Sequence, residues 1–457
     1  MTSTTQPRTS RHLALLLSTV LAVVGILTVG SLTPEAQAAA APRAYLVNAR
    51  TAGQTAAAQK AAVKAGGQVV QAWPQIGVIV VRSTRAGYAK KLMALRDRSV
   101  LSVGDARNEA ARDRVTVNRS VAVSSPGRRI TATATKVGKA DPLAPRQKHL
   151  AQDRAVQAQK ITPGSSSVVV GVLDTGVDDR HRDLAPNFSA ADSVDCTAGG
   201  RPNTAKGAWR GSDSHGTHVA GTIAAARNGF GVTGVAPGAR VASVKVVNGN
   251  GESFPEYIVC GLVWSGTRQL AVTNTSLNLF DLWCGELNIG GPALTSVNRA
   301  IAYANKRGVV QVQSSGNASM DVSWQRGESC HDPLAESPLV VNVSSVDTKG
   351  RLSAFSSFGK GMVDIAAPGE AVYATTTGNR FTTRTGTSQA APQVAGTIAL
   401  MRSRNPKLGV GEVTQRLLTT TKAPAVKGLG SECTGTPRKN SCTGAGQLDS
   451  YAAVRAA

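Results

Sequence analysis

The chain has 457 residues, of which 41% are hydrophobic, 4% are aromatic and 47 are glycine. This length permits two or three modules and a sizeable core, and the composition excludes a fibrous or fully disordered chain. The net charge is +23, and residues 1–140 carry 20 Lys and Arg against 5 Asp and Glu. No zinc-finger spacing, aromatic RNA-binding motif or basic-zipper heptad accompanies this charge, so we expect no sequence-specific nucleic-acid partner.

Residues 1–40 have the pattern of an export signal. Arg8 and Arg11 precede an apolar run at 13–29, and Ala-Gln-Ala follows at 36–38. These are the basic, apolar and small-residue regions of a cleaved signal peptide. The alternative is a membrane anchor, but the run is short for a spanning helix. We therefore predict a secreted, extracellular protein without a stable membrane anchor after cleavage.

Six cysteines follow, an even number that favours disulfides in an exported chain. None forms a C-x-x-C pair or lies in a cluster with zinc spacing. Cys433 and Cys442 close a short loop containing Gly and Pro, and we expect them to pair. Cys284 with Cys330 is the next expected pair, which leaves Cys196 with Cys260.

The pattern of residues 41–105 predicts a small separate module. Its expected elements alternate as β-α-β-β-α-β, a ferredoxin-like α+β order. They are strands at 44–47, 67–73, 76–81 and 100–103 and helices at 51–65, with Thr51 as N-cap, and 86–95. Residues 106–145 are polar and basic without a sustained period, which is typical of a linker.

Residues 146–457 are expected to form the main domain. Short continuous apolar runs alternate there with helical stretches, which predicts a doubly wound, mostly parallel α/β sheet covered by helices. The expected strands are 167–173, 241–247, 272–276, 309–313 and 339–346, and the expected helices are 215–227, 254–270, 291–307 and 388–404.

Three residues beside glycines at element ends are candidates for chemistry. Asp174 ends an apolar strand, His215 begins a small-residue helix, and Ser388 follows Gly386 where another helix begins. Each has a simpler reading: a turn aspartate, a metal ligand paired with His218, or an N-cap serine. The H-x-x-H spacing lacks the glutamate of the H-E-x-x-H zinc motif, which argues against metal.

In combination the three predict nucleophilic catalysis. A serine hydroxyl is a weak nucleophile that needs an adjacent base, and the base needs an orienting carboxylate. The tetrahedral intermediate needs hydrogen-bond donors for its oxyanion. Asn317 follows the strand expected at 309–313 and is the candidate for a side-chain donor.

The segments Asp174-Thr175-Gly176, His215 to Gly221 (HGTHVAG) and Gly386-Thr387-Ser388 resemble the three signature blocks of the subtilisin family of serine peptidases. Their order Asp, His, Ser is also that of the family. The resemblance covers roughly residues 146–451. It implies Ser388 as nucleophile, His215 as general base and then acid, and Asp174 as orienting carboxylate. It implies Asn317 and the backbone N–H of Ser388 as the oxyanion hole.

The same resemblance implies substrate-binding and metal residues. Two stretches resemble the extended segments between which the family clamps a peptide, namely Gly249-Asn250-Gly251 and Ser276-Leu277-Asn278. Asn278 departs from the family's glycine, and Gln389 replaces the methionine usual after the nucleophile. Asp183 and Asn228 match positions where family members hold a structural calcium, and no further N-terminal ligand is assigned.

We therefore predict a secreted serine endopeptidase that acts on protein or peptide substrates as a monomer, needs no cofactor for catalysis, and is made as a zymogen. The module at 41–105 resembles the family's propeptide, an intramolecular inhibitor and folding chaperone, and the maturation site is expected within 106–145. Two alternatives stay open: a protease dedicated to one precursor, and a catalytically silent binding protein with the same fold.

Overall fold

The structure is a computed structural model that describes residues 41–106, 141–277, 291–323, 332–424 and 429–457. Within these ranges, no helix has the length and apolarity needed to cross a membrane. The expected export signal, the main part of the linker, Asn278 and the expected Cys284–Cys330 pair lie outside the described residues.

The small N-terminal module forms the four-stranded antiparallel sheet expected from the sequence, in the order β2-β3-β1-β4. Side chains alternate along β1, so Tyr45 and Val47 pack against the module's own helices while Leu46 faces another cluster. The elements are β1 (Arg43–Ala49), α1 (Thr55–Lys64), β2 (Gln68–Trp73), β3 (Val78–Ser83), α2 (Tyr88–Ala94) and β4 (Val100–Asp105).

The first helix of this module is shorter than expected. A 3-10 turn at Ala52–Gln54 precedes α1, and the side chain of Thr51 accepts no capping hydrogen bond from it. Thr51 is therefore the N-cap residue of the 3-10 turn and not of α1, whose N-cap is Gln54, and its side chain makes no capping hydrogen bond.

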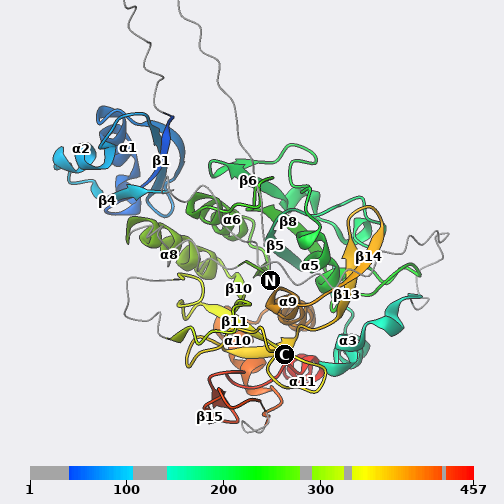
Figure 1. Cartoon of the computed structure of the whole chain (residues 1–457). Coiled ribbons are helices and arrows are strands. Elements are labelled where there is room, and N and C mark those ends of the chain that lie inside the picture. Colours follow the sequence, from blue (N-terminus) through cyan, green and yellow to red (C-terminus); the bar gives the residue numbers. More distant parts are fainter. Residues whose placement is uncertain (1–40, 107–140, 278–290, 324–331, 425–428) are drawn as a thin grey trace, which may run out of the picture. The chain divides into compact units, whose positions relative to one another are not determined.

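The main domain is built on an eight-stranded sheet in the order β12-β11-β10-β9-β5-β8-β6-β7 (Figure 1). All neighbouring strands are parallel except β6 and β7, which confirms the predicted doubly wound α/β sheet. The strands are β5 (Val169–Asp174), β6 (Val194–Ala198), β7 (Arg201–Asn203), β8 (Arg240–Lys245), β9 (Val272–Thr275), β10 (Val310–Ser314), β11 (Val340–Val346) and β12 (Ile365–Pro368).

Helices cover both faces of this sheet, as the continuous apolar strands require. Val170 and Val172 of β5 pack on the face covered by α5 and α9, whereas Leu173 packs on the face covered by α6 and α8. The helices are α3 (Lys148–Gln152), α4 (Ala155–Ile161), α5 (His215–Ala224), α6 (Pro255–Thr267), α8 (Gly291–Lys306), α9 (Thr387–Arg404), α10 (Val410–Thr419) and α11 (Ser450–Ala456).

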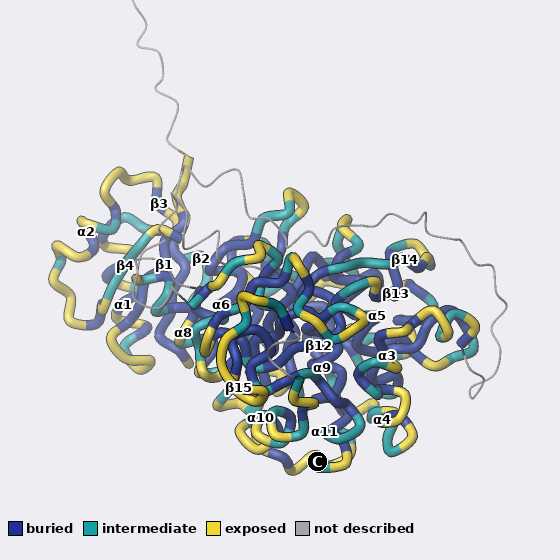
Figure 2. The backbone as a smooth tube through the Cα atoms, turned by 60° about the horizontal axis from the view of Figure 1, so that its bottom comes forward, coloured by how far each residue is buried: buried dark blue, intermediate teal, exposed yellow. Residues whose placement is uncertain are grey.

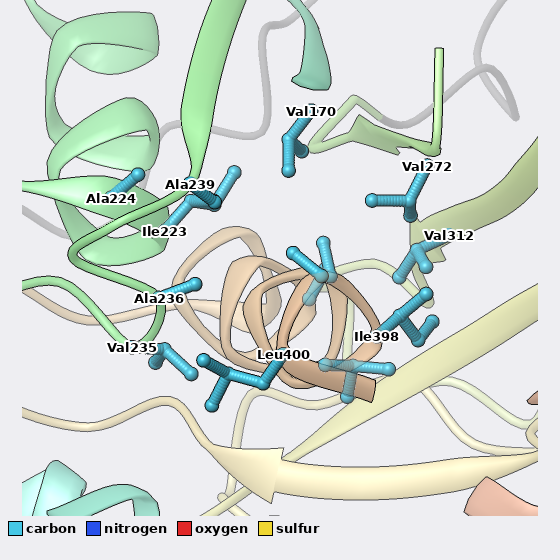
Figure 3. Packing of buried hydrophobic residues seen from close by; sticks show 14 of the residues in the cluster. Val170, Ile223, Ala224, Val235, Ala236, Ala239, Val272, Val312, Ile398 and Leu400 are labelled. Carbon is cyan, nitrogen blue, oxygen red and sulfur yellow. The ribbon is translucent and has the colours of Figure 1, made fainter. Parts of the chain in front are cut away.

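Helix α9 is the centre of the larger core. Its residues from Thr387 to Met401 are all buried, and Figure 2 shows this helix and the central strands in dark blue. In Figure 3, Ile398 and Leu400 of α9 lie among Val170, Val272 and Val312 of the strands. Fully burying one such side chain contributes about 1.5–3 kcal/mol, so this packing fixes the position of the helix that carries Ser388.

Two further hairpins were not predicted from the sequence. The first pairs β13 (Val372–Thr376) with β14 (Arg380–Arg384) beside α5, and the second pairs β15 (Gly435–Thr436) with β16 (Lys439–Asn440). Two disulfides are described, Cys196–Cys260 between β6 and α6 and Cys433–Cys442 across the second hairpin. Both were expected from the sequence.

Candidate active site

The Asp174 and His215 side chains meet at the carboxyl end of β5. His215 Nδ1 lies 2.8 Å from Asp174 Oδ1, and the two side chains are 1% and 0% exposed. Asp174 is the last residue of β5 and His215 the first residue of α5. Because carboxyl ends of parallel strands collect functional groups, this placement is the one expected for a catalytic pair.

Two glycines permit this close approach. Gly216 lies against the loop after β5, where an added Cβ would be 2.4 Å from the carbonyl oxygen of Gly176 and 3.1 Å from Asp174. Gly176 itself has φ +109°, a backbone conformation that side-chain-bearing residues rarely adopt. Thr175 Oγ1 accepts a 3.1 Å hydrogen bond from the N–H of Gly216 and so joins the strand end to the helix start.

Ser388 lies in the first turn of α9, after Gly386. Its backbone N–H belongs to the group of amides that have no acceptor within their own helix, so it is free to face an oxyanion. Pro392, four residues on, has no N–H to donate to the carbonyl of Ser388. The hydroxyl of Ser276 donates to that carbonyl instead, at 3.0 Å.

The hydroxyl of Ser388 donates to the carbonyl of Ser276 at 3.2 Å. His215 Nε2 is buried and has no hydrogen-bond partner among the described residues. The structure therefore brings together Asp174 with His215 and Ser388 with Ser276, and it shows no Ser388–His215 hydrogen bond. Catalytic hydrogen bonds often tighten only with substrate, so the lack of this bond does not argue against the pairing.

Asn317 is held by the residue that precedes the nucleophile. Its Oδ1 accepts hydrogen bonds from the N–H of Thr387 at 2.9 Å and from Thr387 Oγ1 at 2.8 Å. With both of these bonds on the oxygen, the amide NH₂ of Asn317 is left to serve as a donor. Thr387 belongs to a signature block, but its role in orienting Asn317 was not predicted from the sequence.

The second histidine of the HGTHVAG block is structural. His218 Nε2 donates to the carbonyl of Val372 at 3.2 Å, and the side chain is fully buried. Burial, with additional effects from Arg384 and His215, holds the pKa of His218 well below its usual value. His215 is instead paired with Asp174, so the two rings do not converge on a metal ligand geometry.

Two further polar groups lie next to the candidate catalytic residues, one near His215 and one beside Ser388. The guanidinium of Arg384, at the end of β14, donates to Ser214 Oγ at 2.7 Å, one residue before His215. The Gln389 amide, next to Ser388, is buried and has no hydrogen-bond partner among the residues described. Arg384 was not predicted, because nothing local in the sequence links it to Ser214, 170 residues away.

The predicted substrate-binding segments differ in conformation. Ser276 lies beside Ser388 and Leu277 is buried, whereas Asn278 is not among the described residues. The expectation of an extended segment at 249–251 is wrong. These residues form a turn in which the N–H of Gly251 donates to the carbonyl of Asn248 at 3.1 Å. Gly251 has φ +81°, which permits the turn.

Asp183 and Asn228, the predicted calcium residues, share one loop site with Asp141. Asp183 Oδ2 accepts from the N–H of Val232 at 2.8 Å, while its buried Oδ1 has no partner in the described chain. Asp141 Oδ1 accepts from the N–H groups of Asn228 and Gly229 at 3.0 and 2.7 Å. Asp141 was missed because it lies 87 residues before Asn228.

Two buried carboxylates, those of Asp141 and Asp183, lie close enough at this site to interact electrostatically. The pKa of Asp183 is raised to about 8, mainly by burial; the N–H of Val232 works against this rise and the nearby Asp141 adds to it. An orphaned carboxylate oxygen beside a second carboxylate and a side-chain amide is the donor set that suits Ca²⁺. The oxygens of Asp141 and of the Asn228 amide already accept hydrogen bonds, so Asp183 Oδ1 is the oxygen of this set left for a cation, and the described residues hold no group of three metal-binding His, Cys, Asp or Glu side chains.

Comparison with known proteins agrees with this geometry. The model of the Subtilase family matches residues 165–446. The chain is 35% identical to Subtilisin DY of Bacillus licheniformis over 270 residues, covering 58% of this chain and 86% of that protein. It is 36% identical to Subtilisin BL of Lederbergia lenta over 256 residues, covering 56% and 83%.

Two solved structures share the fold. Fervidolysin from Fervidobacterium pennivorans, a keratinolytic enzyme, aligns with a TM-score of 0.66 at 24% identity, covering 92% of this chain and 62% of its own. The epidermin leader peptide processing serine protease of Staphylococcus aureus aligns with a TM-score of 0.66 at 21% identity, covering 91% and 98%. The matching family model and the two subtilisins establish that the chain belongs to the subtilase family and is a serine-type endopeptidase that hydrolyses protein or peptide substrates.

Proposed function

We propose that this chain is a secreted, self-processing endopeptidase that cleaves peptide bonds through an acyl-enzyme on Ser388. The observation that carries the proposal is the buried Asp174–His215 hydrogen bond at 2.8 Å, together with a buried serine in the first turn of α9. Activated serine chemistry needs this combination of nucleophile, base and orienting carboxylate.

In the proposed reaction, Ser388 Oγ attacks the substrate carbonyl carbon while His215 Nε2 accepts its proton. His215 then gives this proton to the leaving amine, and water attacks the acyl-enzyme with His215 again as base. Asp174 keeps the proton on Nδ1 of His215 and stabilises the imidazolium. The Asn317 amide and the Ser388 N–H donate to the oxyanion, and such a donor contributes about 2.7–4 kcal/mol to the transition state.

The module at 41–105 is proposed to be the propeptide. Arg299 of α8 supports this assignment, because its guanidinium donates to the carbonyls of Ala49, Gly77 and Ile76 at 2.9, 3.1 and 3.3 Å. Asn48 adds two bonds, donating to the carbonyl of Pro292 at 2.7 Å and accepting from Ser296 Oγ at 2.9 Å. The Arg299 bonds reach main-chain carbonyls of the module and do not depend on its side chains, whereas the two Asn48 bonds do.

Structural calcium at Asp141, Asp183 and Asn228 is part of the proposal. When bound, Ca²⁺ would neutralise the two buried carboxylates and stabilise the loop around Asn228. No catalytic step depends on it, since subtilisins need no catalytic cofactor. Secretion of the mature enzyme is proposed from the export pattern of residues 1–40 and is supported by the two described disulfides.

The deciding experiment is labelling with a fluorophosphonate, followed by mapping of the modified residue by mass spectrometry. Purified secreted protein should be labelled at Ser388, and His215→Ala should abolish the labelling. Ser388→Ala should accumulate uncleaved, with residues 41–105 still attached. A folded, matured protein that takes no label would instead support a silent binding protein, and normal maturation of Ser388→Ala would mean that another protease cleaves it.

A further inference from the structure

The module at 41–105 contacts the main domain with one face of its sheet. Leu46 of β1 points to this face and shares a buried cluster with Tyr257 of α6 and Val297 of α8. Tyr45, the preceding residue, points to the opposite face and packs in a separate cluster with residues of α1 and α2. The outer sides of α1 and α2 therefore point away from the main domain and are accessible to a partner.

This module is strongly basic. Residues 41–105 contain ten Lys and Arg against two Asp, which gives a net charge of +8. Residues 141–457 have the same net charge, although that part of the chain is several times longer. All ten basic residues of the module are exposed. The module is thus the described part of the chain with the highest density of accessible positive charge.

The outer sides of α1 and α2 carry four of these charges. Lys60 and Lys64 lie one turn apart on α1, and Lys90 and Lys91 lie in α2. The two helices are in contact, because the hydroxyl of Tyr88 in α2 donates to a carbonyl of α1 at 3.2 Å. Lys60, Lys90 and Lys91 take part in none of the ion pairs found among the described residues. We call these four lysines the basic face.

One carboxylate lies close to the basic face. Asp97, between α2 and β4, interacts electrostatically with Lys64. Its side chain accepts a 2.8 Å hydrogen bond from the N–H of Ser99, and its neighbours in the sequence are the exposed Arg96 and Arg98. These two guanidinium groups outweigh the carboxylate, so the face keeps its positive charge.

Exposed apolar side chains lie among the lysines of the basic face. Val63 is 56% exposed and Met93 is 45% exposed. Val63 follows Lys60 by three residues and Met93 follows Lys90 by three, a spacing that places neighbours on one side of a helix. This combination suits the surface of a lipid bilayer, where ammonium groups meet anionic headgroups and apolar groups enter the headgroup region. A dissolved polyanion offers no apolar region to the same side chains.

We propose that the basic face of the module binds the surface of a membrane that contains anionic lipids. The proposal rests on the proposed propeptide role of residues 41–105 and adds a partner to it. The uncleaved chain is held at the anionic lipid surface through the module, and cleavage within 106–145 releases the main domain. The contact is peripheral and electrostatic, with Val63 and Met93 entering the headgroup region.

The test measures co-sedimentation with lipid vesicles of the secreted Ser388→Ala protein, in which mass spectrometry verifies that residues 41–105 are present. We expect binding to vesicles of phosphatidylcholine and phosphatidylglycerol in equal parts, and no binding to pure phosphatidylcholine. Binding should weaken as NaCl is raised, because salt screens exposed charges. Wild-type enzyme that has lost residues 41–105 should remain in solution with either kind of vesicle.

Two quadruple variants of the Ser388→Ala protein form a matched comparison, because both lose four positive charges. The first removes the basic face with Lys60→Gln, Lys64→Gln, Lys90→Gln and Lys91→Gln. The second removes exposed lysines of the main domain with Lys306→Gln, Lys360→Gln, Lys407→Gln and Lys439→Gln. A lysine near an anionic membrane strengthens binding about fivefold, so the first variant should bind at least about tenfold more weakly. The second should bind nearly as well as the parent.

Val63→Ser combined with Met93→Ser separates a lipid surface from a soluble polyanion. This double variant keeps every charge, so it should bind polyphosphate as well as the parent does. It should bind the mixed vesicles more weakly, because the apolar contact with the headgroup region is lost. Circular dichroism verifies that each variant is folded.

Three results would overturn the proposal. They are no binding to the mixed vesicles, undiminished binding by the variant without the basic face, and vesicle binding that the double variant leaves unchanged, which would favour a soluble polyanion. Fluorophosphonate labelling of the wild-type protein tests the proposed function separately. Labelled enzyme whose Ser388→Ala form does not bind vesicles refutes the membrane contact alone, whereas a chain that binds vesicles but takes no label refutes the proposed function alone.

Discussion

Asp174 Oδ1 and His215 Nδ1 are 2.8 Å apart in a pair of side chains that water scarcely reaches, although 41 residues separate them in the sequence. The strand end and the helix start that carry them are fixed from both sides by packing of β5 and α5 in one core. The pair therefore does not need substrate to form, whereas no hydrogen bond joins Ser388 to His215 in the described part of the chain.

Asp174→Asn should lower kcat by about 10⁴-fold with little change in KM, because an amide favours the wrong histidine tautomer. The protein should still fold, since asparagine has nearly the same volume. Kinetics on one peptide and a circular dichroism spectrum check both parts. A loss of less than tenfold would show that Asp174 is not the orienting carboxylate.

Asn317→Ala should lower kcat by about 10²–10³-fold while KM stays close to that of the parent, because the donor acts on the transition state. Thr387→Val is the graded control. It removes the hydroxyl donor to Asn317 Oδ1 and leaves the backbone N–H of Thr387, so its loss should be smaller. Equal losses in KM and kcat for Asn317→Ala would indicate a substrate-binding role instead.

Calcium should raise the melting temperature of the Ser388→Ala protein relative to the same protein in EDTA. At a concentration of 100 Kd, binding to the folded state adds about 2.7 kcal/mol. Asp183→Asn should abolish the response. Asp195→Asn, which loses the same charge beside Lys245, should keep it. A calcium response that survives in Asp183→Asn would place the ion elsewhere.

His149→Leu should stabilise the protein by about 1 kcal/mol or more, because it removes a buried polar group. Neither ring nitrogen of His149 has a partner in the described part of the chain, and burial lowers its pKa to about 3. The folded state thus binds fewer protons than the unfolded state, whose histidine pKa is about 6.5. Stability from this group is present above pH 6.5 and is lost as the pH falls toward 3, by up to about 1.4 kcal/mol per pH unit.

The measurement for His149 is urea unfolding of the Ser388→Ala protein, with and without His149→Leu, from pH 7 to pH 4. Burial raises the pKa of Asp153 to about 7, which opposes this trend, but Asp153 is present in both proteins. His181→Leu is the control, because His181 makes two hydrogen bonds, to Arg380 and Asp183. His181→Leu should therefore destabilise the protein. A stabilising effect of this variant would contradict the explanation given for His149→Leu.

The two described disulfides should differ in their contribution to the free energy of unfolding. Cys196–Cys260 spans 64 residues and Cys433–Cys442 spans 9. The loop-entropy model gives about 4 kcal/mol for the longer loop and about 2.5 kcal/mol for the shorter one. Unfolding in urea of the two Cys-to-Ala double variants should rank them in this order, and the reverse order would show that strain or residual structure dominates.

The sequence predicts those parts of the molecule that depend on local pattern. Continuous apolar strands such as β5 and the small-residue helix α5 are recognisable because burial on both faces restricts their composition. The three signature blocks lie at the ends of such elements, so the approximate positions of Asp174, His215 and Ser388 follow with the sheet.

Long-range contacts account for what the sequence did not predict. Asp141 contacts the loop at Asn228, 87 residues away in the sequence, and Arg384 contacts Ser214, 170 residues away. The hydrophobic periodicity of the sequence predicts neither contact. The turn at 249–251 was mistaken for an extended segment because glycines are compatible with both conformations. The hairpins β13–β14 and β15–β16 have short strands that carry little pattern.

The missing N–H of Pro392 has a mechanical consequence for the enzyme. Because the carbonyl of Ser388 bonds to Ser276 instead of to its own helix, the first turn of α9 is tethered to the end of β9. Two hydrogen bonds join Ser276 and Ser388, because Ser388 Oγ also donates to the carbonyl of Ser276. A peptide that moves Ser276 would therefore act on both bonds. A ligand that displaced Ser276 would therefore leave the Ser388 hydroxyl without its acceptor, while the buried body of α9 stays in place.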